Sequence, residues 1–251
     1  MTQSSPVMAI TGASRGIGAA VARRAARAGY DIALSYVSSE DDAHRVAADV
    51  EAEGQTALVE RCDVADEAQL VSLFERVDSE LGRLDAVIVN AGILFERCRV
   101  EDMTVDRIDR VMAVNVRGAF VTCREAVRRM ATDRGGSGGA IVVVSSAASR
   151  LGSANEFVDY AASKGAMDTL TIGLANEVAQ RGIRVNAVRP GLIHTDIHLD
   201  SGVTDRIEQL QGGVPMGRGG TAEETAEPIV WLCSDEAAYI TGAILDVTGG
   251  R

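Results

Sequence analysis

The run Thr11-Gly12-Ala13-Ser14-Arg15-Gly16-Ile17-Gly18 decides the fold of this chain of 251 residues. It follows directly on an apolar, β-rich segment, residues 7–11, and opens a helical pattern that begins at Ile17. Glycines at such a turn let the backbone approach a pyrophosphate, whose charge is met by free N–H groups at the helix N-terminus. Because strand, turn and helix stand in the order that this binding requires, the run predicts a dinucleotide-binding unit.

Short apolar segments and longer helical patterns alternate along the rest of the chain. The strands are predicted at residues 7–11, 31–36, 56–60, 85–89, 140–145, 183–188 and 243–247. The helices are predicted at residues 17–28, 40–53, 67–81, 105–131, 158–180 and 222–233, with N-caps at Ser39, Asp66 and Thr221. Apolar strands separated by helices favour a parallel sheet covered on both faces. The predicted fold class is α/β, a Rossmann-type doubly wound sheet of seven mainly parallel strands.

The chain reads as one domain, residues 1–251. No proline-rich or serine-rich linker divides it, and its 46% hydrophobic content can fill one large core. Residues 1–6 are expected to be flexible. Residues 192–216 form the one long stretch with weak periodicity, which predicts a lid over a substrate.

Charge and cysteine usage exclude several classes of partner. The formal net charge of -11 repels phosphate backbones and anionic lipids, so neither nucleic acid nor membrane is expected as a partner. No apolar run approaches the roughly 18 residues needed to cross a bilayer. Four widely spaced cysteines without a CxxC pair or a secretory segment indicate reduced thiols and a cytoplasmic location.

One lysine stands among 25 cationic side chains, the other 24 being arginine. This lysine, Lys164, lies four residues after Tyr160 in the run Tyr160-Ala161-Ala162-Ser163-Lys164. An ammonium is a compact point charge on a flexible stem, whereas a guanidinium is a wide planar fork. The exception therefore indicates a chemical role for Lys164, next to a tyrosine on the same face of a helix.

With the glycine-rich turn and the Tyr160-xxx-Lys164 pair, the chain resembles the short-chain dehydrogenase/reductase family over nearly its whole length. Further motifs lie where that family has them: Asp63, Asn90-Ala91-Gly92, Asn115, Ser145-Ser146, Pro190-Gly191 and the tail from Tyr239 to Gly250. Several of them end parallel strands, which is where open α/β sheets hold ligands. Glucose 1-dehydrogenase-like and 3-oxoacyl-carrier-protein reductase-like members are the most similar in character.

The resemblance implies hydride transfer between a nicotinamide cofactor and a carbonyl or secondary alcohol, with Tyr160 as general acid/base. Lys164 is expected to hold the nicotinamide ribose and to help lower the pKa of Tyr160, by about 3 units from its ordinary value near 10. Ser146 is expected to hydrogen-bond the substrate oxygen, and Asn115 to hold a water that links Lys164 to solvent. Ser145 adjoins Ser146, and neighbours on a strand face opposite sides, so one of the two serves; we favour Ser146.

The expected cofactor is NADP, with NAD left open. Tyr36 stands where an acidic residue would exclude a 2′-phosphate, and Arg15 could pair with that phosphate, but no second basic residue follows the strand. Asp63 reads either as a partner of the adenine or as a turn residue. The predicted contacts are Gly12, Ser14, Arg15, Gly16, Ile17, Gly18, Tyr36, Ser38, Asp63, Val64, Asn90, Ala91, Gly92, Tyr160, Lys164, Pro190, Gly191, Ile193 and Thr195.

Two substrate classes stay open. Glu96, Asn155, Glu156 and His194 would give a polar pocket for a sugar or polyol, whereas an acidic carrier protein would need a basic docking patch, for which Arg128 and Arg129 are the candidates. An alternative from another functional class is a catalytically silent protein that binds nicotinamide as a sensor or scaffold.

The family resemblance also implies a homotetramer that pairs the helices at residues 105–131 and 158–180. The imidazoles of His194 and His198, with Asp196 and Asp200 beside them, have a spacing that could bind a metal. No further ligand cluster supports that reading, so no metal is expected.

Overall fold

The computed structural model describes residues 5–195 and 206–251, and in it seven strands form a single parallel sheet. Their order across the sheet is β3-β2-β1-β4-β5-β6-β7, and every neighbouring pair runs parallel. The bounds are β1 Val7–Ile10, β2 Asp31–Tyr36, β3 Ala57–Arg61, β4 Ala86–Val89, β5 Gly139–Val144, β6 Ile183–Pro190 and β7 Ile244–Val247. The predicted doubly wound sheet is confirmed.

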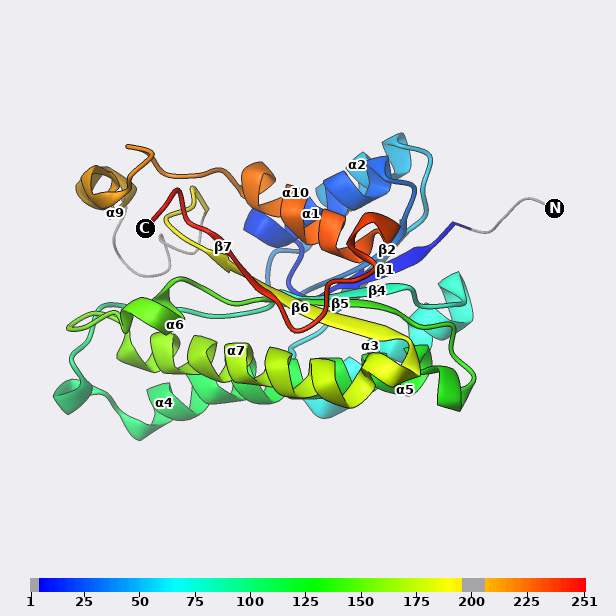
Figure 1. Cartoon of the computed structure of the whole chain (residues 1–251), viewed down its shortest axis with the longest axis horizontal. Helices are drawn as coiled ribbons and strands as arrows, with labels where there is room; N and C mark the ends of the chain where they lie inside the picture. The colour runs from blue at the N-terminus through cyan, green and yellow to red at the C-terminus, as the bar shows by residue number, and fades with distance from the viewer. Residues whose placement is uncertain (1–4, 196–205) are drawn as a thin grey trace.

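Helices cover both faces of the sheet (Figure 1). In Figure 1, α1, α2 and α10 lie above the sheet, and α3, α4, α5 and α7 lie below it. The bounds are α1 Gly16–Arg27, α2 Glu40–Ala52, α3 Glu67–Arg76, α4 Val105–Met112, α5 Ala119–Met130, α6 Ala148–Leu151, α7 Val158–Val178, α9 Arg206–Leu210 and α10 Ala222–Cys233. Successive strand residues point to opposite faces, so Ile88 packs into the upper core and Val87 into the lower one.

The helix predicted at residues 105–131 is interrupted. A π-helical turn, Ala113–Gly118, separates α4 from α5, and it holds the Asn115 side chain in the interior, 1% exposed. Such a turn adds one residue to the helical repeat, often at a functional site, and a pattern with a period of 3.6 does not reveal it. A second π-helical turn, Val77–Leu81, follows α3 in the same way.

The predicted caps are partly confirmed. The Asp66 carboxylate accepts hydrogen bonds from the amides of Ala68 and Gln69, and Thr221 forms a capping box with Glu224. Ser39 occupies the N-cap position of α2 as predicted, although its side chain makes no capping hydrogen bond.

The two segments predicted to be loose lie partly outside the described residues, namely 1–4 and 196–205. Within the first segment, the Pro6 carbonyl accepts a hydrogen bond from the Asp31 amide, which ties it to β2. Around the second, Ile193 pairs with Gly220 and the Met216 amide donates to the Gly249 carbonyl. No helix among the described residues is long and apolar enough to cross a membrane.

Gly18 generates a prediction about the fold. A Cβ atom at this position would lie 2.6 Å from the Gly12 carbonyl oxygen and 2.6 Å from Asn90 Nδ2, so no side chain fits there. We expect Gly18→Ala to lower the free energy of unfolding by about 1–3 kcal/mol, the usual effect of overpacking. Chemical denaturation measures it. The control is Arg27→Ala in the same helix, an exposed position where the change should stay within about 0.5 kcal/mol; equal effects of the two variants would contradict the packing argument.

Candidate active site

A cavity of about 670 Å³ lies at the edge where the parallel strands end. Every residue predicted to bind the cofactor lines it except Gly18, which packs behind the glycine-rich turn. Of the four predicted catalytic residues, Ser146, Tyr160 and Lys164 line the cavity, and Asn115 lies buried behind it. Residues from six separate loops thus meet in one hollow, as expected for the carboxyl edge of a doubly wound sheet.

Contacts between the turn after β1 and the loop after β4 hold the glycine-rich turn in shape. Thr11 Oγ1 accepts hydrogen bonds from the amides of Asn90 and Ala91, each at 3.1 Å. The Asn90 side chain donates in turn to the Gly12 carbonyl at 2.8 Å. Gly12 has a φ of +66°, a left-handed conformation that favours glycine.

The start of α1 fits the pyrophosphate of a dinucleotide. Arg15 occupies the N-cap position without a capping hydrogen bond from its side chain, and the first turn of α1 carries no acidic residue. No side chain of the turn therefore competes for its N–H groups, which can donate hydrogen bonds to an anion. The helix dipole favours the same binding. Across the cleft, Thr195 lies beside Gly16, because a Cβ atom on Gly16 would come within 3.5 Å of the Thr195 side chain.

The predicted catalytic side chains come from three elements. Tyr160 and Lys164 lie one turn apart on α7, and the Lys164 ammonium is 5.6 Å from the centre of the Tyr160 ring. Lys164 is 5% exposed, and its Nζ donates to the Val144 carbonyl at the end of β5 at 2.7 Å. A Cβ atom on Gly92 would lie 3.5 Å from both Lys164 Nζ and Asn115 Oδ1, so the two side chains meet over this glycine.

Asn115 is held by the loop after β4. Its Oδ1 accepts from the Ile93 amide at 2.8 Å, and its Nδ2 donates to the Ile93 carbonyl and to Ser163 Oγ, each at 3.0 Å. Ser163 Oγ donates to the Tyr160 carbonyl at 2.7 Å. The amide of Asn115 is therefore fully engaged in joining the loop after β4 to α7, and Ser163 is a contributor that the sequence analysis did not single out.

The two adjacent serines face different partners. Ser146 Oγ accepts from the Ala148 amide at 3.1 Å, and Ser146 lies close enough to the Tyr160 hydroxyl to lower its pKa. Ser145 is buried, and its Oγ donates to Asp168 Oδ1 at 2.6 Å. Of the two serines, Ser146 is therefore the one next to Tyr160.

Burial sets the ionisation of the site. It lowers the pKa of Lys164 to about 8, while the Asp168 carboxylate acts in the opposite direction. Burial also raises the pKa of Tyr160, and the hydrogen bond from Ser146 lowers it only in part. The lowered pKa expected for Tyr160 is thus not produced by the residues of the chain alone.

At the opposite end of the cavity, Tyr36 and Asp63, both predicted to bind the cofactor, interact with other side chains of the chain. The pKa of Tyr36 is raised by partial burial and by a hydrogen bond to the Glu40 carboxylate. Asp63 Oδ2 pairs with Arg110 at 2.8 Å, and Asp63 Oδ1 accepts from the Ala65 amide at 3.0 Å. Glu40 is an anion that the sequence analysis missed, four residues beyond Tyr36 and in the first turn of α2.

The part of the cavity where a polar substrate pocket was predicted is less polar than expected. Glu156 lines the cavity and pairs with Arg97 at 3.1 Å, whereas Glu96, Asn155 and His194 are not among the described lining residues. His194 turns toward Gly219, where an added Cβ atom would lie 2.9 Å from its Nε2. The wall consists largely of apolar side chains: Leu94, Leu151, Ala154, Phe157 and Leu192.

A buried ion pair braces this end of the site. Arg107 of α4 donates through Nε to Asp159 Oδ2 at 2.7 Å and through Nη1 to the Glu96 carbonyl at 2.7 Å. Asp159 Oδ1 accepts from the Tyr160 amide at 2.9 Å. The pair fixes the first turn of α7 against the loop after β4. A signal for it was present in the sequence as an acid directly before Tyr160.

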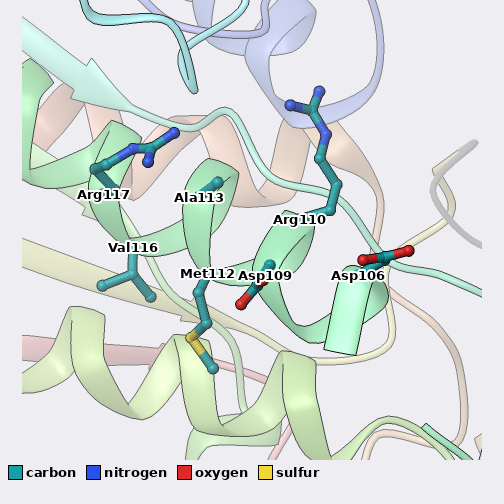
Figure 2. Close-up of a pocket in the computed structure, with 7 residues that line it drawn as sticks. All are labelled: Asp106, Asp109, Arg110, Met112, Ala113, Val116 and Arg117. Carbon is teal, nitrogen blue, oxygen red and sulfur yellow. The ribbon is translucent and has the colours of Figure 1, made fainter. Parts of the chain in front are cut away.

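A second, open hollow of about 700 Å³ lies along α4 and the following π-helical turn, and none of the predicted site residues lines it. In Figure 2, Met112 and Val116 point to one side of the helix, and Arg110 and Arg117 extend to the other.

For metals, the described residues contain no group of three or more His, Cys, Asp or Glu side chains that could hold an ion. Asp196, His198 and Asp200 lie outside the described part of the chain.

Comparison with known proteins agrees with the fold. A parallel doubly wound sheet with a glycine-rich turn at its carboxyl edge defines a Rossmann-type protein. Residues 12–251 match the family model described as "Enoyl-(Acyl carrier protein) reductase". The chain is 52% identical to an uncharacterized oxidoreductase, YgfF, of Escherichia coli strain K12 over 242 residues, which cover 96% of this chain and 98% of that protein.

Two further relatives carry named activities. L-rhamnose 1-dehydrogenase (NAD(P)(+)) of Sphingomonas sp. strain SKA58 is 38% identical, covering 96% of this chain and 94% of that protein. The 3-oxoacyl-acyl-carrier-protein reductase FabG of Staphylococcus aureus is 34% identical, covering 96% of each.

Solved structures are similar over nearly the whole chain. A 3-ketoacyl-(acyl-carrier-protein) reductase of Brucella melitensis, complexed with NADH, superposes with a TM-score of 0.91 at 30% identity, covering 99% of this chain and 98% of that one. A short-chain dehydrogenase of Burkholderia cenocepacia in complex with NADP gives 0.90 at 33%, covering 98% of each. The chain belongs to the short-chain dehydrogenase/reductase family and is an oxidoreductase of that type.

Proposed function

We propose that the protein is an NADP(H)-dependent oxidoreductase that transfers hydride between nicotinamide and a carbonyl or secondary alcohol. The observation that carries the proposal is the meeting of Ser146, Tyr160 and Lys164 in one cavity with the glycine-rich turn. Glycine-rich turn, helix N-terminus and buried ammonium all fit a nicotinamide dinucleotide. The bound cofactor supplies the hydride, and the residues of the chain orient the carbonyl and manage the proton.

The residues of the cavity then have distinct roles in the reaction. Ser146 donates to the substrate oxygen, and Tyr160 exchanges its phenolic proton with the same oxygen, because Ser146 lies close enough to the phenol to lower its pKa. Lys164 keeps a positive charge beside the Tyr160 phenol and offers its ammonium to the ribose. Asn115 holds the loop after β4 against α7 through its fully engaged side-chain amide.

NADP is favoured over NAD by Arg15 and Ser38, which line the adenosine end of the cavity. Glu40, whose carboxylate raises the pKa of Tyr36, opposes this preference because it adds a negative charge beside a residue at this end of the cavity. The relatives do not decide between the two cofactors, since one solved structure holds NADH and another NADP.

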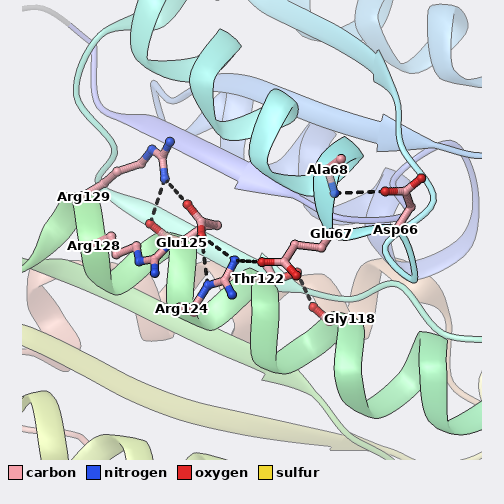
Figure 3. Close-up of polar contacts among 9 residues, drawn as sticks. All are labelled: Asp66, Glu67, Ala68, Gly118, Thr122, Arg124, Glu125, Arg128 and Arg129. Atoms are coloured by element: carbon pink, nitrogen blue, oxygen red, sulfur yellow. Dashed lines mark hydrogen bonds and ion pairs between the residues drawn. The ribbon is translucent and has the colours of Figure 1, made fainter.

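A small-molecule substrate fits the chain better than a carrier protein. The expected basic patch is neutralised from within the chain: in Figure 3, Arg124, Arg128 and Arg129 all bind the buried Glu125. Arg124 also pairs with Glu67 at 2.7 Å and Arg129 with Asp78 at 2.8 Å. Three arginines therefore face three carboxylates, and little positive charge is left to attract an acidic partner.

We also infer a homotetramer, with the outer face of α4 and α5 as one interface. Ile108, Met112, Val116 and Phe120 follow one another at intervals of four residues, and Phe120 is 50% exposed. They form an apolar stripe along the helix pair, which includes part of the hollow in Figure 2. Such a stripe suits an isologous contact with a second copy.

Removing the phenolic hydroxyl tests the catalytic role. We expect Tyr160→Phe to lower kcat about a hundredfold to ten-thousandfold, the usual contribution of a positioned acid/base group, while NADPH still binds. Steady-state assays with a panel of carbonyls and alcohols, together with fluorescence titration of NADPH, measure both quantities. Tyr239→Phe, at a fully exposed position, is the control. Unchanged turnover in Tyr160→Phe would refute the mechanism, and wild-type binding without any turnover would favour a sensor.

Cofactor choice is tested by two opposite substitutions. We expect Arg15→Ala to weaken NADPH binding about tenfold, the equivalent of about 1.4 kcal/mol, with little effect on NADH. Glu40→Gln should shift the preference toward NADPH, because it removes a negative charge from the adenosine end of the cavity. Asp41→Asn, one position further along α2, is the matched control for Glu40. Parallel losses for both cofactors in Arg15→Ala would contradict a phosphate site.

The assembly is tested by a charge on the apolar stripe. We expect the wild type to be a tetramer and Phe120→Glu to be dissociated, because its carboxylate would be buried without a partner in the interface. Light scattering after size-exclusion chromatography gives the mass, and Tyr239→Glu serves as the control at a solvent-exposed aromatic residue. A wild-type monomer, or an intact tetramer in Phe120→Glu, would overturn this interface.

A further inference from the structure

Asp168 is a buried carboxylate that both catalytic and cofactor-binding segments touch. It lies one turn beyond Lys164 on α7 and is 8% exposed. Its Oδ2 accepts from Arg189 Nη2 at 2.8 Å and from Arg189 Nε at 3.1 Å. Its Oδ1 accepts from Ser145 Oγ at 2.6 Å. Both carboxylate oxygens are therefore engaged, one by the residue that follows β5 and the other by a residue of β6.

The partners of Asp168 stand directly beside site residues. Ser145 precedes Ser146 at the end of β5, and its Oγ also lies 3.2 Å from the Lys164 carbonyl oxygen. Arg189 precedes the Pro190-Gly191 turn at the end of β6. One carboxylate thus joins α7, β5 and β6 at the three points from which the cavity is built.

The same carboxylate is an anion in the surroundings of the buried ammonium. Lys164 Nζ has a neutral hydrogen-bond partner, the Val144 carbonyl, and the phenol of Tyr160 on its own helix. Asp168 counteracts the desolvation of Lys164, whose pKa is about 8. Arg189 shares the charge of Asp168, and Asp246 of β7 lies 3.6 Å from Arg189.

Stability alone does not explain this pair. A buried ion pair seldom stabilises a fold more than apolar side chains of similar volume would, because both charges lose their hydration. Its benefit must then lie in what it does to its neighbours, and the neighbour that carries a charge into the site is Lys164.

We propose that Asp168 keeps Lys164 charged, and that its ion pair with Arg189 holds the ends of β5 and β6 in register with α7. Neither residue reaches the substrate; each acts through Lys164, Ser146 or the Pro190-Gly191 turn. The consequence for turnover rests on the proposed function, whereas the effect on the charge of Lys164 does not.

The single lysine makes a direct test possible. Selective labelling with lysine carrying carbon-13 at Cε gives one resonance in the whole chain, that of Lys164. In the wild type, the chemical shift of this resonance should titrate with a midpoint near the pKa of about 8. In Asp168→Asn the midpoint should fall by about one pH unit or more, because Lys164 loses a nearby opposite charge. In Arg189→Met it should rise, because the charge of Asp168 is no longer shared.

The direction in which the Lys164 midpoint moves distinguishes the loss of a nearby charge from a loosening of the structure around Lys164. A merely structural role would let water reach Lys164 and move the midpoint upward, toward the ordinary lysine value near 10.4, in both variants. Ser145→Ala removes a hydrogen bond to Asp168 without changing any charge, so its midpoint should stay within a few tenths of a pH unit of the wild type. An unchanged or raised midpoint in Asp168→Asn would overturn the proposal.

A second variant covers a failure of Asp168→Asn to fold. Asp168→Leu with Arg189→Met replaces the pair by apolar side chains and leaves no unpaired buried charge. Its midpoint should also lie below that of the wild type, and a midpoint equal to or above the wild type would contradict the proposal.

Turnover then gives the functional consequence. At pH 8 we expect Asp168→Asn to lower kcat about fivefold or more, with the loss shrinking as the pH is lowered and Lys164 regains its proton. A loss that is the same at every pH would contradict the role of charge. If no carbonyl is turned over even by the wild type, the proposed function fails while the lysine titration still decides the proposal about Asp168.

Discussion

The burial of one ammonium group is the constraint on which the site depends. Lys164 lies in the interior beside the end of β5, where its charge has lost most of its water. Such a charge persists only where neighbouring groups compensate for the lost hydration. The Val144 carbonyl and the Asp168 carboxylate do so, and they fix where β5 and α7 can lie. An arginine in this position would need more room and more hydrogen-bond acceptors, which explains why lysine occurs here in a chain that otherwise uses arginine.

The parallel sheet supplies the second half of the arrangement. Since all seven strands run the same way, the loops that follow them gather at one edge, and loops far apart in the sequence come into contact. Thr11 and Asn90 show how this works, because their hydrogen bonds join the turn after β1 to the loop after β4. Arg107 of α4 binds both the Glu96 carbonyl in the loop after β4 and the Asp159 carboxylate of α7, and so joins that loop to α7. The cavity is thus shaped by contacts between neighbouring loops.

The sequence predicted the fold and the site wherever the signal was local. A glycine-rich turn between strand and helix, a lysine four residues after a tyrosine and alternating apolar segments each depend on a few adjacent residues. The missed features depend on tertiary contacts. The π-helical turn at Asn115 has no periodic signature, and the pair Asp168–Arg189 forms only once α7 and β6 have packed. The polar substrate pocket was predicted from residue types, but His194 turned toward Gly219 and the basic patch was neutralised by Glu125.

A crystal structure with bound NADPH tests the central claim most directly, namely that Lys164 is the charge around which cofactor and acid/base residue are assembled. We predict that Lys164 Nζ will donate to the ribose hydroxyls next to the nicotinamide, and that the Tyr160 and Ser146 hydroxyls will face the nicotinamide ring from one side. A cofactor whose nicotinamide lies away from Ser146 and Tyr160, with Lys164 Nζ still bound only to the Val144 carbonyl, would contradict the account.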